Sequence, residues 1–436
     1  MSHKPSQTTP KLGADVALVP RLRFPEFREG VPWTVEAFSE VAEFVSEKIS
    51  LEQIELDNYV STENLLADYG GVTRASKLPT TGSATRFRPN DTLVSNIRPY
   101  LKKVWFSNKD GGASNDVIVI RAKHKLLTQY LPFLLKNDSF IDYVMTGAKG
   151  VKMPRGDIDS MKDYPTPFSA PPEQQKIADC LTSLDELIAA QARKVDALKT
   201  HKKGLMQQLF SREGQTQPGL RFPEFQDHGE WTVSSIQELI DKKFIAGHLD
   251  GNHGSLYPRA EEFSDSGVPY ISATNFNNGG IDFGRCRYFS TKRAAQFKKG
   301  IARDGDILFA HNATVGPVAK LNTKHDFVIL STSLTYFRCN CAFLSSDFLQ
   351  CILVSPGFVD QCDRVMSQST RNQIPITTQR TFSLQLPTLP EQLRIADCFT
   401  SLDTLITATA QELDTLKTHK KGLMQQLFPA PAEVVA

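Results

Sequence analysis

The chain has 436 residues, of which 22% are charged and 40% hydrophobic, an ordinary globular composition with enough length for two or three domains. Its formal net charge of +2 neither demands nor excludes nucleic acid, because a basic surface can be balanced by acids elsewhere. No run approaches the roughly 20 apolar residues of a membrane span, which argues against a membrane protein.

The first 20 residues are rich in Ser, Thr and Pro and lack an apolar core, so we expect a disordered leader and no signal peptide. The chain has seven cysteines without CxxC spacing, which indicates free thiols and a reducing cytoplasm. Cys339 and Cys341 could form half of a metal site, but no suitable second pair lies nearby. We therefore expect no metal in this chain.

An internal repeat is the strongest signal in the sequence. LRFPEF at 22–27 recurs at 220–225, and each copy is followed by Trp-Thr-Val. Residues 172–210 then recur at 390–428 without a gap, with most positions identical. The stretches between these repeats show little resemblance. This pattern indicates that the repeated segments form a constant frame with one role. The two unlike stretches between them, which we call the inserts, then have related but distinct roles.

The repeat defines the expected organisation along the chain. It comprises a leader (1–20), a first globular domain (21–170), a first long helix (171–210), a linker (211–219), a second globular domain (220–388), a second long helix (389–428) and a tail (429–436).

Apolar residues at alternating spacings of four and three predict that the two repeated segments are coiled-coil helices. The seam has polar residues at equivalent places, Gln191 and Thr409, which can fix the register of an antiparallel pair. The alternative is that each helix packs only on its own globular domain. The apolar seam consists of Ile177, Leu181, Leu184, Ile188, Val195, Leu198, Leu205, Leu209, Ile395, Phe399, Leu402, Ile406, Leu413, Leu416, Leu423 and Leu427.

Both inserts are predicted to be mixed α/β domains, because short β-rich runs alternate with turn residues and apolar helical segments. The predicted strands are 92–94, 117–120, 268–271, 306–309 and 327–330, and the predicted helical segments are 130–135 and 343–354. Asp91 and Asp306 each precede a buried strand at similar places in the two inserts. We interpret both as turn-forming residues and not as catalytic acids.

Two matched loops, 146–154 and 367–375, lie shortly before the repeated helices and combine small residues with Lys, Arg, Asn and Gln. Such side chains suit contacts with phosphates and base edges. For any single basic residue a solvated surface role is the simpler interpretation. The candidate DNA contacts are Lys77, Arg86, Arg88, Arg98, Lys102, Lys103, Lys149, Lys152, Arg259, Asn275, His311, Asn312, Thr314, Arg371, Asn372 and Gln373.

The sequence contains no recognisable catalytic motif. It has no GxxxxGK[ST], GxGxxG, HExxH or GxSxG, and no (Asn/Asp)-Pro-Pro-(Tyr/Phe) of amino-methyltransferases. We therefore predict no catalytic residues in this chain.

The duplicated helix ending in KKGLMQQLF, the LRFPEF–Trp openings and the LPTLPEQ element at 386–392 resemble the specificity subunits of type I restriction–modification systems. The first copy departs slightly, with FSAPPEQ at 168–174. The resemblance implies two target-recognition domains that each read half of a split DNA sequence, and an antiparallel coiled coil that sets their spacing.

The resemblance also implies partners and a division of labour. Double-stranded DNA would be bound by this chain, modification subunits, two in number, would dock on the repeated regions, and restriction subunits would join through the complex. S-adenosylmethionine, ATP and Mg would be bound and used by those partner subunits. This chain would be non-catalytic and cytoplasmic. The rival hypothesis is a coiled-coil adaptor with two ligand-binding domains and no DNA role.

The duplication also carries a topological prediction. If a pseudo-twofold axis relates the two units, the connection from Phe210 to Leu220 has a counterpart between Phe428 and Leu22. Leu22 and Phe428 should then lie close together.

Overall fold

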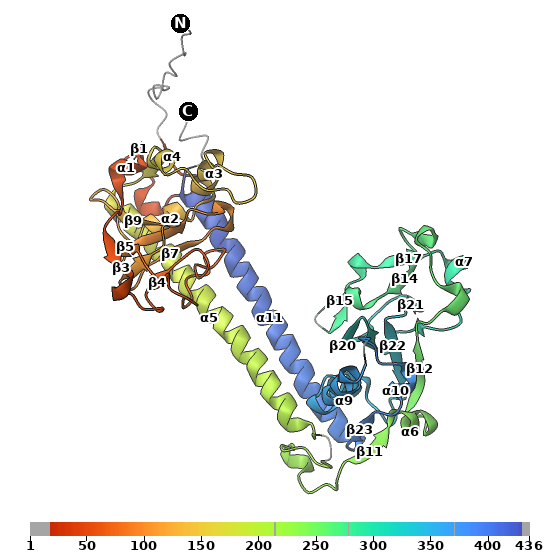
Figure 1. Ribbon diagram of the computed structural model, residues 1–436. Helices are drawn as coiled ribbons and strands as arrows, with labels where there is room; N and C mark the ends of the chain where they lie inside the picture. Colours follow the sequence, from red (N-terminus) through yellow and green to blue (C-terminus); the bar gives the residue numbers. More distant parts are fainter. Residues whose placement is uncertain (1–17, 213–214, 278, 370, 430–436) are drawn as a thin grey trace. The chain divides into compact units, whose positions relative to one another are not determined.

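The computed structural model describes residues 18–212, 215–277, 279–369 and 371–429, and these form two compact units (Figure 1). Unit 1 contains the chain up to Ala192 together with the segment from Gln411 onward, and unit 2 contains Arg193–Ala410. Most of the predicted leader and tail lies outside the described residues.

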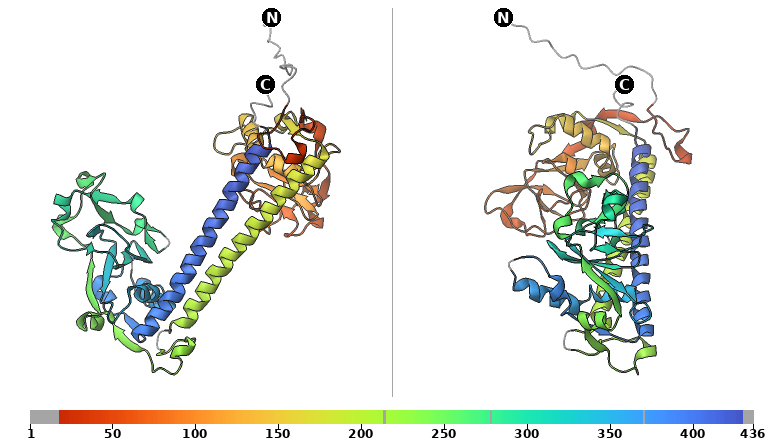
Figure 2. Two further views of the ribbon diagram at one scale, coloured as in Figure 1. Left: turned by 180° about the vertical axis from the view of Figure 1, so that it is seen from behind. Right: turned by 90° about the vertical axis from the view of Figure 1, so that its right-hand side faces the viewer.

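Two helices of 39 residues contribute to both units, α5 (Pro171–Leu209) and α11 (Leu389–Leu427). In unit 1, Gln191 on α5 donates a hydrogen bond to Glu412 on α11 at 2.6 Å. In unit 2, Lys202 on α5 pairs with Asp403 on α11 at 2.6 Å. Residues with higher numbers on α5 contact residues with lower numbers on α11. Within each unit the two helix segments therefore run antiparallel (Figures 1 and 2).

Every apolar residue of the predicted seam is buried or half-buried, while most residues on the outer faces of the two helices are exposed. The polar seam residue Thr409 is 2% exposed and donates its hydroxyl to the carbonyl of Leu405 at 2.7 Å. Repeated positions also make repeated contacts: Lys420 pairs with Asp185 in unit 1 as Lys202 pairs with Asp403 in unit 2. Helix pairing is therefore built into both copies of the repeat.

Each unit begins and ends its globular domain with a short antiparallel ribbon. In unit 1, β1 (Thr34–Ala37) pairs with β10 (Pro165–Phe168), and in unit 2, β11 (Thr232–Ser235) pairs with β23 (Ser383–Leu386). Because the two strands of a ribbon are hydrogen-bonded neighbours, the beginning and the end of each insert lie side by side.

The domain of unit 1 consists of two four-stranded sheets and four short helices. The first sheet has the order β2 (Ala42–Phe44), β9 (Val117–Ala122), β6 (Thr92–Ser95), β7 (Val104–Phe106), and the second has β3 (Lys48–Ser50), β5 (Ser83–Phe87), β8 (Gly111–Ala113), β4 (Tyr59–Val60). The helices are α1 (Phe38–Val41), α2 (Leu131–Leu135), α3 (Asp138–Thr146) and α4 (Ile158–Lys162).

The domain of unit 2 repeats this plan with additions. Its first sheet has the order β12 (Ile245–Asp250), β22 (Leu334–Cys339), β19 (Ile307–Asn312), β20 (Thr314–Lys320), and its second has β13 (Phe263–Ser264), β17 (Arg287–Phe289), β14 (Val268–Ile271), β21 (Val328–Leu330), β18 (Ile301–Ala302). A two-stranded ribbon and five helices complete it: β15 (Phe276–Asn277), β16 (Gly280–Ile281), α6 (Ile236–Asp241), α7 (Thr291–Ala294), α8 (Ser346–Ile352), α9 (Pro356–Ser367) and α10 (Ile376–Gln379).

Short 3₁₀ helices connect these elements at Pro25–Phe27, Leu51–Gln53, Pro99–Leu101, Pro223–Phe225, Gly254–Leu256, Ala260–Glu262, Ala273–Asn275 and Phe283–Arg285. The predicted strands and helical segments of both inserts are confirmed. The two domains share a topology despite their unlike sequences: both first sheets are antiparallel with matching strand order, and each second sheet contains one parallel pair, β4–β8 or β14–β21.

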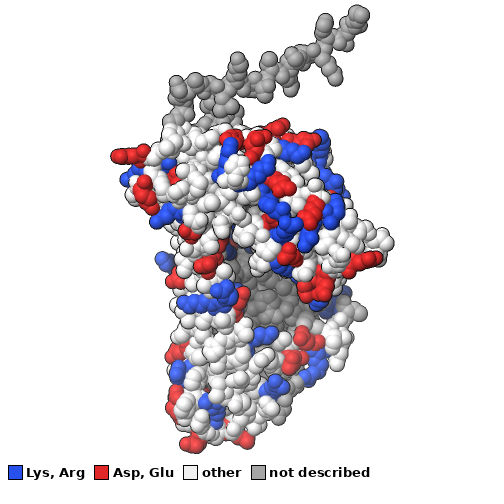
Figure 3. Space-filling view, turned by 90° about the vertical axis from the view of Figure 1, so that its left-hand side faces the viewer, with Lys and Arg blue, Asp and Glu red and all other residues white. Residues whose placement is uncertain are grey.

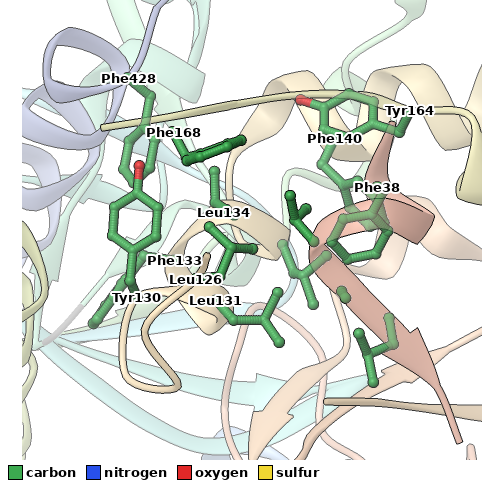
Figure 4. Close-up of a cluster of buried hydrophobic side chains, with 14 of the residues drawn as sticks. Phe38, Leu126, Tyr130, Leu131, Phe133, Leu134, Phe140, Tyr164, Phe168 and Phe428 are labelled. Atoms are coloured by element: carbon green, nitrogen blue, oxygen red, sulfur yellow. The ribbon is translucent and has the colours of Figure 1, made fainter. Parts of the chain in front are cut away.

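The main core of unit 1 joins the domain to the end of α11 (Figure 4). Phe428 stacks on Tyr130 with a centroid separation of 5.6 Å and meets the edge of Trp33 at 6.2 Å. In unit 2, Phe210 at the end of α5 meets Trp231 at 6.5 Å and Phe348 at 5.8 Å. The repeated KKGLMQQLF segments thus end on aromatic anchors: the first copy in the domain that follows it, and the second copy in the first domain, which precedes it in the sequence.

Both predicted boundaries before the LRFPEF segments need a small correction. Trp33 donates its backbone N–H to Leu18 at 3.0 Å, and Trp231 donates to Thr216 at 3.1 Å. Leu18 is buried. The end of the expected leader and the end of the expected linker are therefore parts of the two domains, held by equivalent backbone hydrogen bonds.

Candidate nucleic-acid interface

A buried ion pair fixes the base of each domain. Arg23 donates two hydrogen bonds to the carboxylate of Glu173 at 2.7 Å, and Arg221 does the same to Glu391 at 2.8 and 2.6 Å. All four side chains are less than 10% exposed. Planar two-point pairing of this kind holds both groups in one geometry. It ties each LRFPEF segment to the first turn of a long helix.

A repeated glutamine connects the same helix turn to the insert. Gln174 accepts a hydrogen bond from the backbone of Leu127 at 2.8 Å and donates to Ser169 at 2.7 Å. Gln392 accepts from Ser345 at 3.0 Å and donates to Pro387 at 3.0 Å. These hydrogen bonds to the variable domain go to its backbone, so they do not depend on which side chains the insert carries at those positions.

The two turn aspartates have the structural role that the sequence predicts. Asp91 accepts the backbone N–H of Arg88 at 2.8 Å, and Asp306 accepts that of Arg303 at 2.7 Å. Each also pairs with an arginine of a neighbouring strand, Arg121 at 2.7 Å in unit 1 and Arg338, also at 2.7 Å, in unit 2.

In unit 1 the structure brings the two predicted basic clusters together. Arg98 has a left-handed backbone (φ 50°) and donates its N–H to Pro154 at 2.7 Å. Arg155, in the same loop as Pro154, exchanges two backbone hydrogen bonds with Lys149 at 2.9 Å. The connection from β6 to β7 and the loop after α3 therefore form one surface, which we call the first loop cluster (residues 97–103 and 148–155).

Unit 2 has an equivalent surface. Ala313, at the tip of the β19–β20 hairpin with φ 65°, donates its N–H to Asn372 at 2.9 Å. The side-chain amide of Asn372 donates back to the carbonyl of Ala313 at 2.8 Å. Asn312 and Gln373 form an isolated β-bridge. We call this the second loop cluster (residues 312–314 and 371–373), and it contains five of the predicted contacts.

Four of the eight basic candidates of unit 1 pair with an acidic side chain. Glu47 binds both Arg86 at 3.3 Å and Arg88 at 2.9 Å. Lys102 pairs with Asp138 and lowers the pKa of that carboxyl through its hydrogen bond. Lys103 donates to the backbone of Thr62 at 2.5 Å. The face in Figure 3 shows blue and red side chains intermixed.

Lys149 is the most exposed paired cation of the first loop cluster. Its side chain is 82% exposed and lies 2.6 Å from Asp157. The hydrogen bond that Lys149 donates to Asp157 raises the pKa of Lys149, and the same bond lowers the pKa of Asp157. Solvent screens such a pair, so the ammonium can exchange the carboxylate for a phosphate at little cost.

The remaining candidates fall into two groups. Lys77, Lys152, Arg259, Thr314 and Arg371 are exposed on loops or strand ends. Asn275 and His311 are only 4% and 2% exposed. Asn275 accepts from Ser272 at 2.9 Å and donates to Arg285 at 2.9 Å, and His311 Nδ1 lies 3.0 Å from the carbonyl of Ile374. These two side chains hold turns together inside the domain and do not reach the surface.

Sequence reasoning missed Arg155, which joins the two halves of the first loop cluster and pairs with Asp116 at 2.6 Å. It also missed Arg23, Glu173 and Gln174. A signal for these three existed, because each is identical in the second copy of the repeat.

The described residues offer no alternative metal centre or membrane helix. Within the described ranges, no group of three His, Cys, Asp or Glu side chains is placed to hold a metal ion. Burial raises the pKa of Cys339 to about 12, whereas Cys341 is exposed. In the described part of the chain, no helix is both long enough and apolar enough to cross a bilayer.

Comparison with known proteins identifies the family. A family model described as "Type I restriction modification DNA specificity domain" matches residues 32–200 and 228–418. The type I restriction enzyme MjaVIII specificity subunit of Methanocaldococcus jannaschii is 24% identical over 336 residues, which are 76% of each chain.

Two solved structures have the same fold. A chain from a study of complex assembly and conformational transition of the type I R-M system matches with a TM-score of 0.58 and 17% identity, covering 92% of this chain and 98% of that one. The type I restriction–modification S subunit of M. genitalium matches with a TM-score of 0.58 and 16% identity, covering 95% and 100%. Because the family model matches both halves of the duplication, the chain belongs to the type I restriction–modification specificity subunits and has two target-recognition domains.

Proposed function

We propose that this chain reads a bipartite DNA target, one half-site per domain, through the first and second loop clusters. The observation that carries the proposal is their equivalence. In both units the loop before the repeated helix is hydrogen-bonded to a left-handed turn between two strands of the first sheet, at Arg98 or Ala313. Two inserts with unlike sequences keep this contact, although the connection at Arg98 contains a 3₁₀ helix and the connection at Ala313 is a tight hairpin.

The side chains of the clusters suit DNA chemistry. Arg371 can bind phosphate or guanine through its planar fork, and Gln373 offers the amide that pairs with adenine. Arg98, Lys149, Lys152 and Arg155 supply positive charge in unit 1. Phosphate contacts position the protein, and base-edge contacts then give each domain its sequence preference.

The paired helices are proposed to set the unread gap between the half-sites, because helices extend by 1.5 Å per residue and resist bending. The repeated frame is proposed to dock two modification subunits, one at each copy, with restriction subunits joining through the complex in the cytoplasm. Methylation with S-adenosylmethionine and cleavage with ATP and Mg are assigned to those partners, and this chain is assigned a non-catalytic role.

The test is selection from random duplexes by the full chain assembled with its modification subunits. The expected result is enrichment of two short sequences separated by a fixed number of unread base pairs. Exchange of residues 34–170 for another insert should change one half-site only. Enrichment of a single continuous site, or of none, would contradict the proposal. A non-DNA adaptor is the weaker alternative, because it gives no reason for matched polar loops in both inserts.

A further inference from the structure

The second domain contains a polar cavity that neither loop cluster explains. Its volume is about 420 Å³, within the range of about 300–1,000 Å³ common for small-ligand pockets. It lies at the second sheet of unit 2, where Tyr270 on β14 and Arg287 on β17 line it. Its other walls are the turn after β14 and the turn between β21 and β22, together with Tyr257 before β13 and Arg285 before β17.

Hydroxyl groups cover two walls of the cavity, and internal hydrogen bonds hold them. Ser272 Oγ lies 2.8 Å from Thr274 Oγ1, and Ser331 Oγ lies 2.6 Å from Ser333 Oγ. Ala273 donates its backbone N–H to Ser333 Oγ at 3.3 Å, which connects the two turns. Hydroxyls arranged in this way can donate several hydrogen bonds to one anionic group.

The charge of the cavity is positive. Arg285 and Arg287 line it, and its lining includes no Asp or Glu. Among the residues that the structure describes, neither arginine forms an ion pair with a carboxylate, in contrast to Arg293 and Arg338 of the same domain. The guanidinium carbon of Arg287 lies 5.0 Å from the centroid of the Phe263 ring, a cation–π contact that restrains the side chain.

Two tyrosines complete the cavity. Tyr257 is 57% exposed, so its ring face is accessible. Burial and the nearby Tyr257 raise the pKa of Tyr270 to about 12, so its hydroxyl remains a neutral donor at physiological pH. A cavity with two guanidiniums, a set of hydroxyls and an accessible aromatic face combines the groups that bind a phosphate ester and an aromatic base.

We propose that this cavity binds a nucleotide unit, with its phosphate at Arg285 and Arg287 and its base against Tyr257. The nucleotide is proposed to belong to the bound DNA strand, an assignment that rests on the proposed function. Its position favours this source. His311 donates its backbone N–H to Ser333 at 2.9 Å, so the cavity wall adjoins strand β19, which ends at Asn312 in the second loop cluster.

The experiment uses the full chain and three variants: Arg285→Gln/Arg287→Gln, Tyr257→Ala, and the control Arg303→Gln, which alters an exposed arginine outside the cavity. Calorimetric titration measures binding of the four deoxynucleoside 5′-monophosphates and of inorganic phosphate. Fluorescence anisotropy measures duplex affinity against salt concentration. Melting temperatures check that each variant is folded.

The double arginine variant is expected to lose about tenfold or more in nucleotide affinity and in duplex affinity, because hydrogen bonds to charged groups are lost. Its salt slope should fall by about 0.9, the value for one phosphate contact. Tyr257→Ala should lower the affinity for nucleotides but leave the affinity for inorganic phosphate unchanged. Arg303→Gln should match the wild type in every assay.

The outcomes separate the two proposals. If the double arginine variant binds nucleotides and duplex as the wild type does, the cavity proposal is overturned, while normal duplex binding by both chains leaves the proposed function intact. If nucleotides depend on the arginines but duplex affinity does not, the cavity takes free nucleotides. If the wild-type chain binds no duplex either alone or assembled with its modification subunits, the proposed function fails, and the nucleotide titration still decides the cavity.

Discussion

The backbone N–H of Leu22 donates a hydrogen bond to the carbonyl of Gln426 at 2.9 Å. In unit 2, Leu220 makes the same bond with Gln208, also at 2.9 Å. Gln208 and Leu220 are near each other in the sequence, whereas Leu22 and Gln426 come from opposite parts of it. The predicted closeness of Leu22 and Phe428 is confirmed, and Phe428 packs against Trp33 in the same place.

This bond predicts that the chain tolerates circular permutation. A variant that joins Phe428 to Leu22 through a copy of residues 211–219, with new ends between Arg212 and Gln215, should fold with a melting temperature close to that of the wild type. The reason is that every equivalent contact survives. Thermal unfolding followed by circular dichroism measures this. A permutant opened at Val119, inside the buried strand β9, is the control and should not fold. Failure of both permutants would contradict the prediction.

The Arg23–Glu173 pair predicts a large stability effect. Arg23→Met leaves the carboxylate of Glu173 buried without a partner, which should lower the free energy of unfolding by roughly 3–5 kcal/mol. Urea titration measures the loss. Arg74→Met is the matched control, because the Arg74–Asp57 pair is 67% and 62% exposed and should contribute at most about 1 kcal/mol. Adding Glu173→Met should restore most of the stability, and a double variant no better than Arg23→Met would rule out this explanation.

Buried histidines predict that unit 2 loses stability in acid. Burial lowers the pKa of His248 to about 4, whereas an unfolded histidine titrates near 6.5. Between these values the unfolded chain binds the extra proton, so the stability present above pH ~6.5 is lost as pH falls towards 4, by about 3 kcal/mol for this residue. Burial lowers the pKa of His253 and His311 in the same direction.

Urea titrations from pH 4 to pH 7 test the histidine prediction. His248→Gln should reduce the slope of unfolding free energy against pH. The exposed His325→Gln should leave it unchanged. Equal slopes for wild type and His248→Gln would show that His248 does not cause the acid sensitivity.

The loop clusters predict local effects on DNA binding. Arg371→Ala and Lys152→Ala should each weaken duplex affinity and reduce the salt slope by about 0.9, since each removes one exposed cation from a cluster. Lys299→Ala, an exposed cation outside the second loop cluster, should change neither quantity. Anisotropy titrations at several salt concentrations measure both. An unchanged slope for Arg371→Ala would exclude a phosphate contact at that residue.

The coiled coil predicts a change in target spacing. Removing one heptad from the middle of both α5 and α11 shortens each helix by about 10 Å, equivalent to about three base pairs. The methylated half-sites should keep their sequences and move closer together. Sequencing of methylated bases in host DNA measures this. Removal of four residues from each helix, which breaks the seam, is the control and should abolish methylation. An unchanged gap after removal of the heptad would contradict the proposed spacer role.

The parts of the fold that depend on local pattern could be predicted. The seam from Ile177 to Leu209 has a heptad period that favours paired helices, and the run at 117–120 is too short and too β-branched for a helix. The partners of charged residues could not be predicted. Glu47 is distant in sequence from Arg86, and Asp116 from Arg155. Such pairs depend on how strands meet, which the residues themselves do not encode locally.

The candidate interface shows the same division. Lys149 and Arg371 are predictable because they lie on loops matched between the copies. The inward orientation of Asn275 and His311 could not be predicted from the sequence, because a polar residue in a turn can either point to solvent or hold the turn together. The cavity at Arg285 and Arg287 had no sequence signal, since its walls come from separated segments that only the folded sheets bring together.

The ribbons β1–β10 and β11–β23 have an evolutionary consequence. Thr34 lies opposite Phe168, and Thr232 lies opposite Leu386, so each insert begins and ends at adjacent points. The second insert is longer than the first, yet the ribbon and the Arg–Glu pair at its base are the same. A gene segment that begins at one strand of a ribbon and ends at the other can therefore be replaced by recombination without disturbing the rest of the chain. New DNA specificities can arise in this lineage by exchange of whole domains, one half-site at a time.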